Sequence, residues 1–215
     1  MSKIANRTEF IVLIAAIVAS ALIAGVSTRI SNIKATPPHR LTSTKVNISR
    51  DFIVDQYKDL EATPNDSYIL IEFMDYECNP CRSSDAYLKK IISRKGNILK
   101  TRVCNFPLPF HKNATNAALS VESARDQGQF NKMHDAVITS ENLDMINLKK
   151  IAEKLGLNMD KYNKSIATSA IDSLEKDKKI AEKLGIDETP SFFLCKPNGE
   201  VYRVGNVTEI ERFLQ

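Results

Sequence analysis

The sequence predicts an α/β fold that carries an inserted all-helical domain and is preceded by an N-terminal apolar segment. A β-type pattern at Tyr68–Met74 leads through a short turn into a helix-type pattern, and a second β-type pattern follows at Ile98–Phe106. Between Lys112 and Ser169 apolar residues recur only at helical spacing. Two short strand patterns then flank a hairpin turn at Pro197–Gly199. Strands on both sides of a purely helical stretch indicate a sheet domain with a helical insertion.

The start of the chain divides into three segments. Residues 1–9 are a short basic tail, and residues 10–26 are an uncharged apolar run close to the lower length limit of a membrane span. Residues 27–47 are rich in Ser, Thr, Asn and Pro, which is typical of a tether. We expect residues 10–26 to be a transmembrane anchor, with a cleaved signal peptide as the alternative.

The charges before the apolar run predict its orientation. Lys3 and Arg7 precede it, and basic flanks tend to stay in the cytoplasm. The remaining chain is then expected to face the periplasm of a bacterial envelope, anchored in the inner membrane. Cleavage at the small residues Ala19–Ala21 or Ala24–Gly25 would instead release a soluble periplasmic protein.

Residues 48–110 are predicted to form the first part of the sheet domain. The expected elements are a helix at Ser49–Glu61 with Ser49 as its N-cap, a core strand at Tyr68–Met74, a helix at Pro80–Ser93 and a parallel strand at Ile98–Phe106.

Residues 111–170 are predicted to form the helical insertion, and residues 171–215 the second part of the sheet domain. Three helices are marked within the insertion by Ala114–Ala124, Phe130–Ile138 and Leu148–Leu155. The second part should contain a helix that ends at Gly185, strands at Ser191–Cys195 and Val201–Val204, and a helix at Thr208–Leu214.

The cysteine pair is the strongest chemical signal. Cys78 and Cys81 stand at the junction between the first core strand and the following helix. Unpaired N–H groups and the positive end of the helix dipole favour a thiolate there, which is the attacking species in disulfide exchange. A C-x-x-C sequence can also be half of a metal site, but the strand-to-helix junction favours redox chemistry.

The other candidate ligands carry weaker signals. Cys104 and Cys195 are expected to be free thiols, and His111 and His134 to be loop and helix-surface residues. A zinc or copper site that joins the cysteine pair to a histidine is the rival from another class, and no second close pair of ligands supports it. No metal or cofactor is therefore expected. The 30 basic and 26 acidic residues leave a net charge of +4, which is too small to predict nucleic-acid binding.

Three further segments are distinctive: Phe73–Cys78 (FMDYEC), Asn105–His111 (NFPLPFH) and Gly185–Phe193 (GIDETPSFF). They resemble, in that order, the approach to the active site, the F-P-L segment and the Thr-Pro segment of the DsbA family of thiol:disulfide oxidoreductases. That family has a thioredoxin-like fold with a helical insertion and includes membrane-tethered and periplasmic bacterial members.

The resemblance implies a role for each matching residue. Cys78 would be the nucleophile and Cys81 the resolving thiol, and together they would form the redox-active disulfide. Pro190 would be cis, and the backbone of Thr189 would pair with the bound substrate. Glu72 would be the buried acid that moves a proton to or from Cys81.

Four residues around the cysteines are expected to tune the redox potential. Between the cysteines the chain has Asn79 and Pro80, where strong oxidants of the family have Pro and a thiolate-stabilising His. Glu188 replaces the glycine before Thr-Pro, and Glu77 directly precedes the first cysteine. Nearby negative charge opposes a thiolate.

The function expected from these features is the introduction of disulfides into reduced exported client proteins. A membrane partner protein would then reoxidise the Cys78–Cys81 pair. A disulfide isomerase or reductase on the same fold is the alternative, and an envelope zinc- or copper-binding protein is the alternative of another class.

Replacing Asn79 with His should make the protein more oxidising, because an imidazolium beside Cys78 stabilises the reduced, thiolate form. The wild-type potential should lie between about −270 mV for thioredoxin and about −120 mV for DsbA. A glutathione titration of both proteins measures this. A wild-type potential as high as DsbA's, or no upward shift in the variant, would contradict the electrostatic argument.

Overall fold

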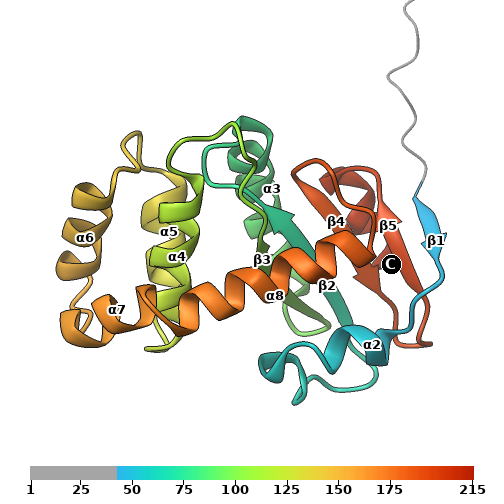
Figure 1. Cartoon of the computed structure of the whole chain (residues 1–215). Coiled ribbons are helices and arrows are strands. Elements are labelled where there is room, and N and C mark those ends of the chain that lie inside the picture. The colour runs from blue at the N-terminus through green and yellow to red at the C-terminus, as the bar shows by residue number, and fades with distance from the viewer. Residues whose placement is uncertain (1–42) are drawn as a thin grey trace, which may run out of the picture. The chain divides into compact units, whose positions relative to one another are not determined.

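The computed structural model describes residues 43–215 (Figure 1). The predicted basic tail and apolar segment, and all but the end of the predicted tether, lie outside these residues. Among the residues described, no helix combines the length and apolarity needed to span a membrane.

The core is a five-stranded sheet with the order β1-β5-β4-β2-β3. Strand β2 lies between β3, which runs parallel to it, and β4, which runs antiparallel to it. The bounds are β1 (Thr44–Val46), β2 (Tyr68–Met74), β3 (Leu99–Asn105), β4 (Ser191–Cys195) and β5 (Val201–Val204). The β-α-β order and the hairpin predicted from the sequence are confirmed.

Helices cover both faces of the sheet. On one face, Leu70 packs with Leu88 of α3 (Asn79–Lys95) and Ile210 of α9 (Ile210–Phe213). On the other face, the alternate side chains of β2 pack with α2 (Arg50–Val54) and α8 (Ser169–Lys183). The nearly continuous apolar sequence of β2 is explained by this double burial.

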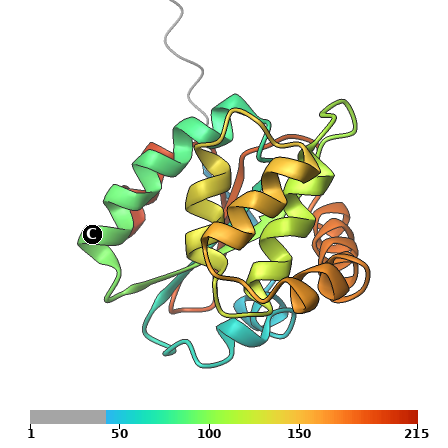
Figure 2. The ribbon, with the colours of Figure 1, turned by 90° about the vertical axis from the view of Figure 1, so that its left-hand side faces the viewer.

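The insertion consists of α4 (Ala114–Arg125), α5 (Phe130–Ile138), α6 (Met145–Lys154) and α7 (Met159–Ile166). These helices gather at one side of the sheet, and α8 runs from them back across it (Figures 1 and 2). Their apolar core includes Met74 at the end of β2, together with Cys78 and Cys81. The insertion therefore packs against the cysteine end of the sheet domain.

Three expectations need correction. The helix predicted for Ser49–Glu61 is α2, capped by Ser49 as expected, followed by a separate 3₁₀ turn at Lys58–Leu60. It breaks because Tyr57 has an extended backbone and its buried hydroxyl donates to Asp177 of α8. The end of the predicted tether forms β1, which pairs with β5. Helix α7 was not predicted, and its capping residue is Asn158.

Candidate active site

Cys78 occupies the N-cap position of α3. Its backbone is extended (φ −75°, ψ 114°), and its N–H donates to the Asp75 carbonyl at 3.2 Å. Its carbonyl accepts the first helical hydrogen bond, from Arg82 N–H at 3.1 Å. The predicted placement of the first cysteine at the start of the helix is confirmed.

The two thiols differ in exposure. Cys78 retains 6% of its surface, whereas Cys81, one turn along α3, is fully buried. Both are free thiols. Burial raises the pKa of the Cys81 thiol, and the neighbouring Cys78 thiol adds to the shift. An external reactant can therefore reach Cys78 first.

The Thr-Pro segment lies against the first cysteine. Cys78 Sγ donates to the Thr189 carbonyl oxygen at 3.3 Å, and the Thr189–Pro190 peptide bond is cis, as the resemblance implied. Asn79 and Pro80 are exposed. A shallow groove of about 380 Å³ joins these parts, and it is lined by Glu77, Cys78, Asn79, Pro80, Leu108, Phe110, His111, Asp187, Glu188 and Thr189.

The two acidic residues expected to act on the thiolate both line this groove, in different settings. Glu77 is half-buried, and its carboxylate accepts from the backbone N–H of Asn113 at 2.6 Å. The side chain of Glu188 is 78% exposed, and its carboxylate lies 3.8 Å from the Arg203 guanidinium. Water screens Glu188 more strongly than Glu77.

Asp75 holds the turn before Cys78, a role that the sequence analysis did not assign. Its carboxylate is buried and accepts from the N–H groups of Glu77 and Leu108, each at 2.7 Å. The His111 ring lies 2.8 Å from the same carboxylate. The residue was visible in the FMDYEC motif, but the chain segments that it joins could not be read from that motif.

His134 is buried, which corrects the prediction of a helix-surface residue. Its ring nitrogens lie 2.9 Å from the Tyr76 hydroxyl and 3.1 Å from the Asp85 carboxylate. Arg82 makes a second bridge, because its guanidinium donates to the carbonyls of Tyr76 and Ser140. Both contacts tie the insertion to the active-site turn.

Glu72 lies on β2 and is buried, with 4% of its surface exposed. Its Oε1 has no hydrogen-bond partner, and among residues 43–215 no hydrogen bond joins its side chain to Cys81. Burial, together with the Asp85 charge, raises the pKa of Glu72 to about 8. The carboxyl group is therefore able to exchange a proton near neutral pH.

The remaining cysteines and histidines form no metal site among the residues described, where no cluster of three possible ligands occurs. Cys104 and Cys195 are buried free thiols on the strands that flank β2, as expected. Burial raises the pKa of both thiols. Cys104 donates to the Tyr57 hydroxyl at 3.0 Å.

Comparison with known proteins places the fold in a family. A family model described as Thioredoxin matches residues 63–215. The structure is similar to a thioredoxin-like oxidoreductase from Silicibacter pomeroyi (TM-score 0.60, 20% identity, 70% of this chain and 86% of that one). It is also similar to the thiol-disulfide exchange protein alpha-DsbA2 from Wolbachia pipientis (TM-score 0.57, 18% identity, 75% of this chain and 91% of that one).

Curated relatives include much longer proteins. A Na(+)/H(+) antiporter NhaA 1 from Salinispora arenicola is 27% identical over 170 residues, which is 74% of this chain and 26% of the antiporter. The chain therefore spans about a quarter of the length of the curated relatives it matches.

Replacing Glu72 with Gln should flatten the dependence of stability on pH. The raised pKa means that the folded state holds the proton while the unfolded chain loses it above its normal value of 4.5. The contribution of Glu72 to wild-type stability is therefore largest below that value and declines as the pH rises to about 8.

Between pH 5 and pH 8 the titration of Glu72 should lower the free energy of unfolding of the wild type by about 3 kcal/mol, and the variant should not show this loss. Urea unfolding of both proteins at the two pH values measures the difference, and shared effects of other groups cancel. Parallel pH profiles for the two proteins would rule out this titration.

Proposed function

The chain belongs to the thioredoxin family, and on that premise we propose that it is a thiol–disulfide oxidoreductase that transfers the Cys78–Cys81 disulfide to client proteins. The observation that carries the proposal is the pairing of a slightly exposed Cys78 at the N-cap of α3 with a fully buried Cys81 one turn later. Such a pair has one sulfur that a reactant can reach and one internal thiol that closes the disulfide with it.

The reaction would proceed in two exchange steps. A client thiolate attacks Cys78 Sγ of the oxidised pair, forms a mixed disulfide and releases Cys81 as a thiolate. A second client thiolate then attacks the client sulfur of the mixed disulfide and releases Cys78 as a thiolate. The client gains a disulfide, and both protein thiols end reduced.

Glu72 is proposed to donate a proton to the Cys81 thiolate and to accept one from the Cys81 thiol. A thiolate at a fully buried position is costly, so the released sulfur requires a proton source close to its side of the sheet. Glu72 lies on the strand that leads to the cysteines, and its pKa of about 8 suits proton transfer at neutral pH. Because Oε1 has no hydrogen-bond partner, the protonated carboxyl is free to pass its proton to a water molecule between Glu72 and Cys81.

The groove beside Cys78 is the proposed contact surface for clients. The carbonyl of Thr189 is within hydrogen-bond reach of Cys78 Sγ, so a client strand that pairs with the Thr189 backbone would bring its sulfur to the reacting atom. Phe110, with 75% of its surface exposed, adds an apolar contact at the same groove. Reduced exported proteins and a membrane partner that reoxidises the pair are the proposed reactants.

Cys81→Ser should accumulate mixed disulfides between Cys78 and client proteins, because an adduct that the Cys78 thiolate forms by attacking a client disulfide can no longer be released by attack of the Cys81 thiolate on Cys78 Sγ. Cys78→Ser is the matched control and should accumulate none. Non-reducing gels followed by identification of the adducts measure the yield. Equal yields from both variants would reverse the proposed division of roles.

The proposed location is the periplasmic side of the inner membrane, where an oxidising environment allows disulfides to persist. An alkaline phosphatase fused after Gln215 should be active in the intact chain, because its own disulfides form only outside the cytoplasm. Deleting residues 10–26 from the same fusion should abolish the activity. An active cytoplasmic reporter at the same junction would contradict the proposed location.

A further inference from the structure

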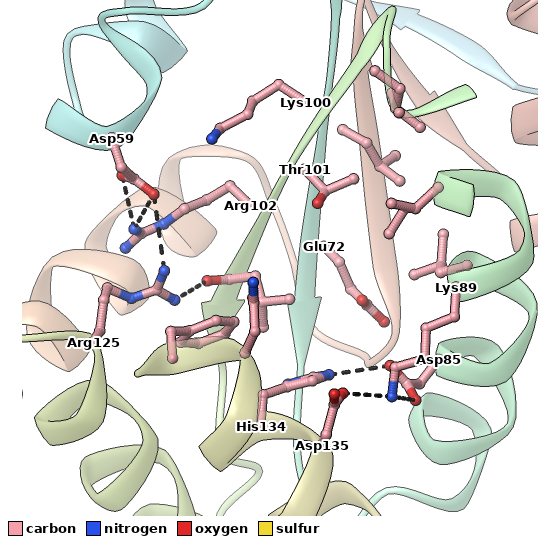
Figure 3. A pocket seen from close by; sticks show the side chains of 18 of the residues that line it. Asp59, Glu72, Asp85, Lys89, Lys100, Thr101, Arg102, Arg125, His134 and Asp135 are labelled. Carbon is pink, nitrogen blue, oxygen red and sulfur yellow. Dashed lines mark hydrogen bonds and ion pairs between the residues drawn. The ribbon is translucent and has the colours of Figure 1, made fainter. Parts of the chain in front are cut away.

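A cavity of about 760 Å³ lies between α3 and α5 and has β2 and β3 as its floor (Figure 3). This volume is in the range of small-molecule sites. The cavity shares no lining residue with the groove at Cys78. Part of its wall is apolar and is formed by Leu70, Leu88, Ile92 and Leu99.

Glu72 is the unusual polar group of this cavity. Its side chain extends from β2 into the space between α3 and α5 (Figure 3), and its Oε1 is buried without a partner. An unsatisfied buried acceptor of this kind carries a desolvation penalty that a bound donor can remove.

The other acidic residues of the lining already have basic side chains as partners. Asp85 lies 2.8 Å from Lys89 and 3.1 Å from His134, and Asp135 lies 2.7 Å from Lys89. Asp59 lies 2.8 Å from Arg102 at the far rim. Among the carboxyl groups that line the cavity, Glu72 is therefore the one that lacks a partner and can pair with a bound cation.

We propose that this cavity binds a small molecule that carries a primary ammonium group on an apolar body, with the ammonium group against Glu72 and the body against Leu70, Leu88 and Ile92. The ammonium group supplies the donors that the carboxyl lacks, and a charged donor makes the stronger hydrogen bond. The apolar body gains by leaving water.

The electrostatics of Glu72 agree with this assignment. Burial and the Asp85 charge raise the pKa of Glu72 to about 8, which shows that the empty cavity disfavours its charged form. An ammonium ion in contact acts in the opposite direction and stabilises the carboxylate. An anionic ligand in contact with Glu72 would disfavour the carboxylate further, because like charges repel.

Three probes of nearly equal shape test the proposal: phenylbutylamine, phenylbutanol and phenylbutyrate. Each is titrated calorimetrically into the full-length chain in detergent micelles, with blank micelles subtracted. The amine should bind at least about tenfold more tightly than the alcohol, since a charge-assisted hydrogen bond replaces a neutral one. The butyrate should bind more weakly than the alcohol.

Variants locate the site. Glu72→Gln should bring the amine to the affinity of the alcohol, whereas the matched rim variant Asp135→Asn should leave the preference for the amine in place. Thr101→Phe, which fills the cavity from β3, should abolish binding of the amine and of the alcohol. This variant tests the site if Glu72→Gln does not fold. Equal affinities for the three probes, no saturable binding, or an amine preference that survives Glu72→Gln would overturn the proposal.

Discussion

The position of Cys78 depends on one buried carboxylate. Asp75 accepts from Glu77 N–H in the turn before the cysteine and from Leu108 N–H in the segment after β3, and it also contacts His111. These groups come from two separate parts of the chain, so one side chain fixes the turn and one wall of the groove together. A buried carboxylate with fewer partners would be costly in this place, and its three contacts offset that cost. The start of α3 is therefore set by tertiary contacts as well as by helix capping.

The helical insertion completes the site by burying what the sheet domain alone would expose. Its core takes in Met74, Cys78 and Cys81, and the bridges made by His134 and Arg82 attach it to the turn at Tyr76. The difference in exposure between the two thiols follows from this packing. The packing also affects the chemistry of Cys81, because burial disfavours the thiolate form of this thiol.

Much of this architecture could be predicted from the sequence. The alternating and apolar patterns located β2, β3 and the β4–β5 hairpin, and the left-handed glycine Gly185 follows the end of its helix as expected. The cysteine pair was recognisable because its chemistry depends on a local junction. The misses share a different cause: the break at Tyr57, the edge strand β1 and the burial of His134 are each decided by partners distant in the chain. Local patterns do not contain that information.

Glu72 has a part in both proposals, as the proton donor for Cys81 and as the unpartnered carboxyl of the cavity between α3 and α5. It stands on a strand that ends at the active-site turn, and the charge that helps raise its pKa is that of Asp85, on the cavity side. A buried acid with no hydrogen bond to Oε1 lowers the stability of the fold at neutral pH, and groups with such perturbed pKa values concentrate at functional sites. A cationic donor that reaches this carboxyl from the cavity would favour its ionised form and would remove the proton that Glu72 is proposed to supply to Cys81. If Glu72 serves Cys81 as proposed, occupation of the cavity and the rate of disulfide exchange would be coupled through the ionisation of this one side chain.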